Sequence, residues 1–128
     1  MPTFARRVLS GSTDGRPIQI SGTAGAITIH TGSTSTNTID DVFAYAQNNY
    51  SEALELKIEF GITGTDTTII HPVGARQGAE IVIPGLGLKG RSAAGQTVGV
   101  FLGGLNGSAS VANGLVQVFG YVNRITDP

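Results

Sequence analysis

The most motif-like stretch of the sequence is a run of glycines at positions 85–90. Residues Gly85–Gly90 spell G-x-G-x-x-G directly after an expected strand, a spacing that can cradle the pyrophosphate of a dinucleotide. That chemistry needs a helix directly after the glycines and an acidic residue about twenty positions later. The chain instead continues with Arg91–Gly95 and a further strand pattern, and positions 104–110 contain no acid. We therefore interpret the motif as a glycine-rich connection between β-strands, with no bound cofactor.

The two histidines, His30 and His71, each fall at the end of an expected strand, and Asp66 lies near His71 in the sequence. Two imidazoles and a carboxylate are a ligand set for a metal on a β-scaffold. A cupin-like site would place two histidines one residue apart with a glutamate soon after, and this spacing is absent. We expect each histidine to be an ordinary half-exposed strand residue and expect no bound metal.

Asp40 and Asp41 are adjacent carboxylates, the residue type that enzymes use in pairs for acid–base work. Neighbouring residues of a strand point to opposite faces, so these two are poorly placed to share a substrate. We expect them to end a loop before a strand. Serines are plentiful, but no G-x-S-x-G elbow occurs, and cysteine is absent, which excludes disulfides and thiol nucleophiles. The sequence therefore predicts a protein that is not an enzyme and has no small-molecule substrate.

The composition describes a domain with enough apolar material for a core and few charges. Of 128 residues, 40% are hydrophobic and 13% are charged, and the formal net charge is −1. No apolar stretch approaches the ~20 residues of a membrane span, and the N-terminus lacks a secretory signal, so we expect synthesis in the cytoplasm of the cell that produces the protein and no membrane partner. The arginines are dispersed and not clustered with aromatic residues, which predicts no nucleic-acid partner. They are Arg6, Arg7, Arg16, Arg76, Arg91 and Arg124.

Apolar and charged side chains alternate over Ala53–Phe60, the clearest structural pattern in the chain. Side chains alternate between faces in a strand, so this segment is predicted to lie with one face on a core and the other in water. Glu55, Lys57 and Glu59 form the water-facing side. The apolar positions are Leu54, Leu56, Ile58 and Phe60.

Other short strand patterns recur between turn residues. Asp41–Asn48 has the alanine content of a short helix, but its Val, Phe and Tyr favour a strand, which we expect to form a hairpin with Ala53–Phe60 across Asn49–Glu52. Two further strands are expected to end at Pro72 and Pro84. These two strand patterns lie at 67–71 and 79–83, and the remaining ones lie at 4–9, 17–20, 27–30, 97–102 and 115–122.

About nine or ten short strands with turn signals between them, and no convincing long helix, predict an all-β fold. We expect one β-sandwich domain over residues 1–128, with an extended N-terminal arm (1–15) and a C-terminal tail (123–128). Within the arm, residues 4–9 are expected to be either a free extended segment or an edge strand. An eight-stranded jelly roll fits the number of strands, and an immunoglobulin-like sandwich is the alternative. The pattern does not specify the strand order.

Five stretches, in order along the chain, resemble small virion proteins that tailed phages encode beside their head genes. The resemblance implies a capsid cement or decoration protein, typically a homotrimer, that binds the outer capsid surface between major capsid subunits and stabilises the head. It places the protein in the virion, with the major capsid protein as its partner. The loop at 103–114 is longer here than in the family pattern, so its role transfers least. The five stretches are Leu9–Ile18, Ile29–Thr31, Ile39–Ala46, Ile83–Leu86 and Gly120–Ile125.

Within this interpretation, the capsid contacts are expected on the N-terminal arm, which can add a strand to a neighbour's sheet, and on the uncharged loops. The alternative is a glycan-binding module of a phage tail or fibre, with Tyr45, Tyr50 or Tyr121 as stacking platforms. The candidate contact residues are Phe4, Arg6, Arg7, Arg16, Leu105 and Asn106.

Overall fold

The structure, a computed structural model, describes residues 2–20, 27–61, 67–91, 97–104 and 116–127. These residues form strands and turns, and no helix among them is long and apolar enough to cross a membrane. The strands are β1 (Thr3–Val8), β2 (Ile18–Gln19), β3 (Ile27–Thr31), β4 (Thr38–Asn48), β5 (Leu54–Gly61), β6 (Thr67–Val73), β7 (Gln77–Lys89), β8 (Thr97–Gly104) and β9 (Val116–Thr126).

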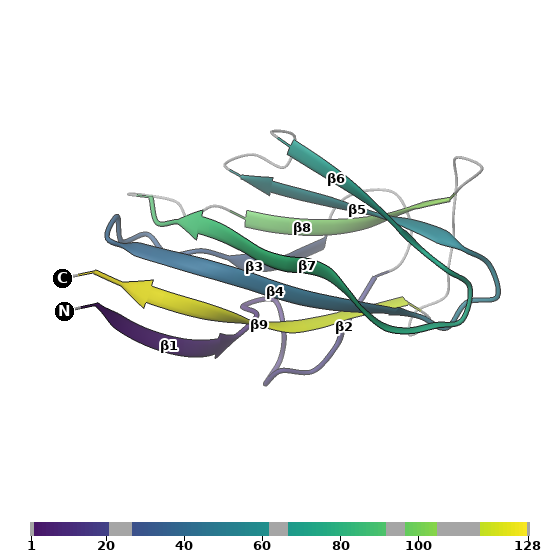
Figure 1. Ribbon diagram of the computed structural model, residues 1–128, viewed down its shortest axis with the longest axis horizontal. Coiled ribbons are helices and arrows are strands. Elements are labelled where there is room, and N and C mark those ends of the chain that lie inside the picture. The colour runs from purple at the N-terminus through teal and green to yellow at the C-terminus, as the bar shows by residue number, and fades with distance from the viewer. Residues whose placement is uncertain (1, 21–26, 62–66, 92–96, 105–115, 128) are drawn as a thin grey trace.

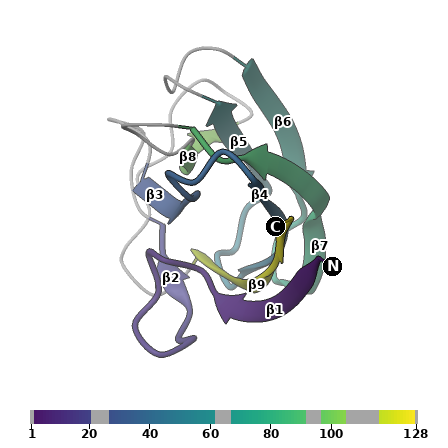
Figure 2. The ribbon, with the colours of Figure 1, turned by 90° about the vertical axis from the view of Figure 1, so that its left-hand side faces the viewer.

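The strands form two antiparallel sheets that face each other across one core (Figure 1; Figure 2 is the end-on view). Sheet A has the order β1-β9-β4-β7, with β2 also paired to β9, and sheet B has the order β3-β8-β5-β6. The strands pair from the outside of the chain inward, as β2·β9, β3·β8, β4·β7 and β5·β6. Successive pairs alternate between sheet A and sheet B. This is the jelly-roll arrangement, with β1 as an additional strand beside β9. The predicted all-β, jelly-roll-like sandwich is confirmed.

The chain crosses from sheet A to sheet B between β4 and β5, so the predicted hairpin of these two strands is wrong. The prediction of a strand at Asp41–Asn48 is confirmed, because half-buried and buried side chains alternate over these residues of β4. Its neighbours, however, are β7 and β9, whereas β5 pairs with β6 and β8. Both strands bury one apolar face in the same core. Strands that face each other across the sandwich bury their apolar faces as well as strands paired in a hairpin do, so the apolar pattern does not distinguish the two arrangements.

Pro72 and Pro84 were predicted to end their strands, but they lie inside β6 and β7. Each strand is at the edge of its sheet, where one side of the strand has no neighbour and a missing N–H does not break the ladder. Pro84 lies opposite Phe43, next to a shift in the β4·β7 register. The glycine motif at 85–90 therefore falls mostly within a strand, and not in a connection between strands.

The two segments expected to be an arm and a tail pair with each other. β1 runs antiparallel to the end of β9, from Thr3 opposite Thr126 to Val8 opposite Tyr121. Figure 1 shows the two strands side by side, with the chain ends at the same end of the sandwich. Within the segment expected to be an arm, β1 is therefore an edge strand of the protein's own sheet, which is one of the two forms expected for residues 4–9.

The core lies between the sheets and contains the apolar face of β5 that the sequence identified. Leu54, Leu56 and Ile58 are buried, and Phe60 is half-buried against the same cluster. The opposite face of β5 is half-buried, so it is less open to water than predicted. The other buried apolar residues are Leu9, Ile20, Ile29, Val42, Ala44, Ala46, Val73, Val82, Ile83, Leu88, Val98, Val116, Val118 and Val122.

Gly120 is the point where β9 and β4 approach too closely for a side chain. A Cβ at this position would collide with the carbonyl oxygen of Phe43 and lie 2.9 Å from the Cα of Ala44. We expect Gly120→Ala to lower the free energy of unfolding by about 1–3 kcal/mol or more, because backbone must move to relieve the overlap. Gly78→Ala is the control, since a Cβ at Gly78 meets nothing within 4 Å. Urea denaturation measures both, and equal stability of the two variants would contradict the close approach.

Candidate functional site

The outer face of sheet A, which points away from the core, carries apolar side chains that the core does not use. Opposite residues of neighbouring strands share a face, so the pairings Phe4–Ile125 and Ile125–Ile39 define one row across three strands. Four large apolar side chains on this face are exposed: Phe4 (74%), Ile81 (52%), Val8 (49%) and Ile39 (41%). Clustered exposure of this kind marks an interaction surface more often than isolated exposed residues do.

Two aromatic pairs lie side by side in the middle of this face. The rings of Phe43 and Tyr121 stack with centroids 5.1 Å apart, and those of Tyr45 and Phe119 stack at 5.7 Å. The Arg6 guanidinium lies 4.4 Å from the Tyr121 centroid, a cation–π distance.

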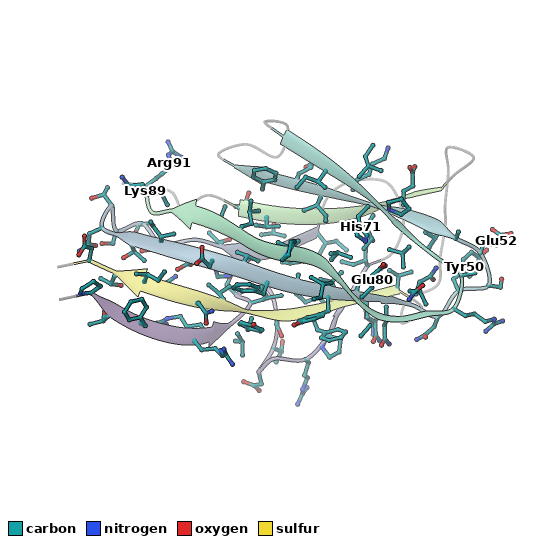
Figure 3. All side chains as sticks on the ribbon, in the orientation of Figure 1. Tyr50, Glu52, His71, Glu80, Lys89 and Arg91 are labelled. Carbon is teal, nitrogen blue, oxygen red and sulfur yellow. The ribbon has the colours of Figure 1, made fainter. Side chains whose placement is uncertain are left out.

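The three tyrosines proposed as glycan platforms therefore have protein neighbours. Tyr45 and Tyr121 each stack on a phenylalanine, and Arg6 also packs on Tyr121. Tyr50 packs against the core cluster from the turn after β4, and Figure 3 labels it beside Glu52 at one end of the sandwich.

A hollow of about 370 Å³ opens on the same face next to the aromatic pairs. Asp41 and Asn123 are opposite each other in the β4·β9 register, and Arg6 is opposite Asn123 in the β1·β9 register. Arg6 Nε donates a long hydrogen bond of 3.5 Å to Asn123 Oδ1. The hollow thus has one cation, one anion and one amide between apolar walls, a mixture that suits an inserted side chain of a partner. Its lining residues are Phe4, Ala5, Arg6, Asp41, Asn123 and Ile125.

A buried ion pair beneath the hollow holds the two central strands in register. Asp40 of β4 is fully buried and lies opposite Arg124 of β9. Arg124 Nε donates to Asp40 Oδ1 at 2.7 Å and Arg124 Nη2 donates to Asp40 Oδ2 at 2.8 Å, a bidentate geometry. Because side chains alternate, fixing Asp40 opposite Arg124 on the inner side fixes Asp41 opposite Asn123 on the outer side.

His30 of β3 completes this network from sheet B. Its Nε2 lies 2.8 Å from Asp40 Oδ2, and its Nδ1 lies 3.1 Å from the backbone nitrogen of Ser10. A backbone N–H can only donate, so Nδ1 accepts, and Nε2 carries the proton that is donated to Asp40. Both ring nitrogens are therefore occupied within the protein, an arrangement that positions strands and leaves no free nitrogen for a substrate. The prediction of a half-exposed His30 is wrong, because its side chain is buried.

The network changes the proton affinity of its charged members. Burial raises the pKa of the Asp40 carboxyl, but the hydrogen bonds from Arg124 and His30 outweigh burial, and the pKa lies below its ordinary value. The hydrogen bond to Asp40 raises the pKa of Arg124 above its ordinary value. Asp40 and Arg124 are therefore both charged at neutral pH.

His71 meets a different carboxylate, at the opposite side of the sandwich. In Figure 3, His71 of β6 and Glu80 of β7 point toward each other, and His71 Nε2 lies 3.5 Å from Glu80 Oε2. Like His30 and Asp40, this pair joins sheet B to sheet A. The described residues contain no cluster of three or more His, Asp or Glu side chains suited to a metal ion, and Asp66 lies outside them.

The structure separates the six predicted contact residues into three groups. Phe4 and Arg6 lie on the outer face of sheet A and line the hollow. Arg7 points to the other side of β1, and Arg16 is exposed in the turn region before β2. The two loop residues, Leu105 and Asn106, lie outside the described part of the chain.

Sequence reasoning missed the other members of this face, above all Asp41, Asn123 and Ile39. The available signal was the alternation of Thr38–Asn48, which places odd-numbered residues together on one side of β4. It also missed Arg124, whose partner is distant in sequence and becomes a neighbour only through the β4·β9 pairing.

Comparisons with known proteins relate the fold to viral capsids. Structures of infectious bursal disease virus are similar over 98% of this chain, with TM-scores of 0.62 for the Gx strain and 0.57 for a T13 viral particle, both at 11% identity. T=1 particles derived from a mutant VP2 protein of the same virus give a TM-score of 0.56 at 11% identity. The chain spans about a third of the length of these proteins, covering 33%, 31% and 32% of them, respectively. No family model and no curated protein sequence matches. The fold is that of viral capsid jelly-roll-like domains.

Removing the buried carboxylate should destabilise the protein in a pH-dependent manner. We expect Asp40→Asn to lower the free energy of unfolding by about 3–5 kcal/mol at neutral pH, since Arg124 loses its partner in a largely buried site. The pKa of Asp40 is lower in the folded protein than in the unfolded chain. Its contribution is therefore present above about pH 4 and lost as the pH falls through the folded value.

Urea denaturation between pH 2 and pH 7 measures this contribution. Asp41→Asn is the matched control, because it makes the same chemical change one residue away on the outer face and should alter stability by about 0.5 kcal/mol or less. An Asp40→Asn variant with unchanged stability and unchanged acid dependence would contradict the role assigned to the network.

Proposed function

We propose that the protein is a non-enzymatic structural component of a phage virion, a capsid cement or decoration protein. It binds the outer surface of the capsid between major capsid subunits and stabilises the head. The observation that carries this proposal is the apolar outer face of sheet A, where four large side chains are exposed beside a hollow. The similarity of the fold to viral capsid domains and the resemblance of the sequence to head-associated virion proteins support it.

The chemistry of the outer face of sheet A suits contact with another protein. Its charged side chains are few (Arg6, Asp41 and, at the end of β7, Lys89), so little charge must be desolvated when the face is covered. Stacked aromatic rings present rigid area that loses little conformational entropy on binding. The outer face of β5, by contrast, carries Glu55, Lys57 and Glu59. We therefore orient sheet A toward the capsid and sheet B toward solvent.

The proposed assembly on the capsid is a homotrimer that bridges neighbouring capsid subunits. Three modest contacts on one rigid trimer act at high effective concentration, so each interface can be weak while the trimer stays bound. Contact area that spans subunit boundaries resists the outward pressure of packaged DNA. Light scattering measures the oligomeric mass, and a strictly monomeric protein would contradict the trimer.

Replacing the most exposed apolar residue of the face tests the docking surface. We expect Phe4→Ser to weaken binding to capsids of the same virus assembled without this protein by about 10-fold or more, as for a truncated interface anchor. Ile70→Ser is the control, because Ile70 is also exposed (54%) but lies on β6 of sheet B. Cosedimentation across a concentration series gives the affinity and the stoichiometry.

The wild-type protein should bind these capsids saturably. Absence of binding by the wild-type protein would overturn the proposed function, and equal losses in the two variants would overturn the choice of face. Binding on a glycan array without capsid binding would favour the alternative of a tail or fibre module.

A further inference from the structure

The edges of the two sheets differ in whether another strand could join them. An edge strand presents unpaired N–H and C=O groups, and proteins block such edges with prolines, bulges or short strands. Among the described residues, β7 contains Pro84 and three register shifts, β6 contains Pro72, and β3 has a register shift between Thr28 and His30. β2 is only two residues long.

β1 has none of these blocks. Its register with β9 is unbroken from Thr3 to Val8, it contains no proline, and it lacks residues with positive φ. All six of its residues are exposed. Among the edge strands described, β1 therefore offers a regular hydrogen-bonding edge that a further strand can extend.

We infer that the free edge of β1 binds an extended, acidic segment of a partner protein, which joins sheet A as an additional strand. Under the proposed function this partner is a capsid subunit, and in that respect the inference rests on that function. Strand addition uses main-chain hydrogen bonds for affinity and alternating side chains for specificity. The specificity here comes from two adjacent cations, Arg6 and Arg7.

The charges of β1 select the partner. Arg6 and Arg7 are adjacent, so they project to opposite sides of sheet A, and β1 contains no acidic residue. Arg7 has no hydrogen bond or ion pair to any residue that the structure describes, while Arg6 packs on Tyr121. Opposite charges across neighbouring strands stabilise the pair, and like charges destabilise it. Two adjacent acidic residues in the partner would neutralise both arginines.

A second copy of this chain is a poor occupant of the same edge. Pairing two β1 strands would gather four arginines with no carboxylate in either strand. The arginines thus disfavour edge-to-edge association of identical copies while attracting an acidic strand. The apolar residues Phe4 and Val8 flank them on the outer face, so the partner strand should place apolar residues opposite both.

Amide hydrogen exchange on full-length protein tests the inference directly. With capsids assembled without this protein, alternate amides of Thr3–Val8, those that do not face β9, should exchange at least 10-fold more slowly than in the free protein. A second probe is a synthetic peptide with the core Val-Glu-Glu-Thr-Val, which aligns its glutamates with Arg7 and Arg6 in an antiparallel pairing. The same peptide with lysines in place of the glutamates is its control.

Charge reversal at one arginine separates the edge from the face. Arg7→Glu should weaken binding to the capsid and to the glutamate peptide by at least 10-fold and improve binding of the lysine peptide. Arg76→Glu is the matched control, an arginine that is also exposed, in the turn before β7, and that should leave both affinities unchanged. Circular dichroism confirms that the variants are folded.

The outcomes distinguish this inference from the proposed function. Capsid binding that leaves the β1 amides unprotected and tolerates Arg7→Glu would overturn strand addition and retain the capsid role. If capsids do not bind, hydrogen exchange with the glutamate peptide still tests strand addition. Failure of this peptide to protect the β1 amides would overturn the inference. Protection of β1 by self-association without any partner would overturn it as well.

Discussion

The constraint on which this structure depends is that a buried carboxylate must be paired. Asp40 is fully buried in sheet A, and it is stabilised by a bidentate arginine from β9 and an imidazole from β3. Removing Arg124 would leave the Asp40 carboxylate buried without a cation, which costs more than the pairing contributes. The network therefore sets the β4·β9 register and joins sheet B to it, while hydrophobic burial supplies most of the stability. Because the inner contact fixes the β4·β9 register, it also places Asp41 opposite Asn123 in the hollow on the outer face.

Both histidines act as links between the sheets. His30 reaches Asp40 from β3 to β4, and His71 reaches Glu80 from β6 to β7, so each pair joins strands that are consecutive in the chain but belong to different sheets. These two histidine contacts thus lie where the chain changes sheet, whereas the Arg124–Asp40 pair lies within sheet A. The aromatic pairs and the exposed apolar residues remain on the outer face of sheet A, where they are free to meet another molecule.

Much of the fold could be predicted from alternation alone, and the errors share one cause. β5 and β4 were identified as strands from their patterns, and the all-β sandwich followed from the number of short strands. The hairpin of β4 with β5 and the ends assigned at Pro72 and Pro84 were wrong, because alternation reports which face of a strand is buried and not which strand lies beside it. The same limit applied to the site. Phe4 and Arg6 were identified, but Asn123 and Asp41 meet only through pairings between distant segments.

The sequence by itself determined where the strands are and which side of each is apolar, since these follow from the local geometry of an extended chain. It also determined the unusual sparseness of charge and the adjacent arginines of β1. Only the tertiary structure decided the nested pairing of the jelly roll, the burial of His30 and Asp40, and the pairing of β1 with β9. The physical reason is that backbone N–H and C=O groups are alike at every residue, so any strand can pair with any other locally. The choice is made by the packing of the whole core together with the few buried charges that must meet.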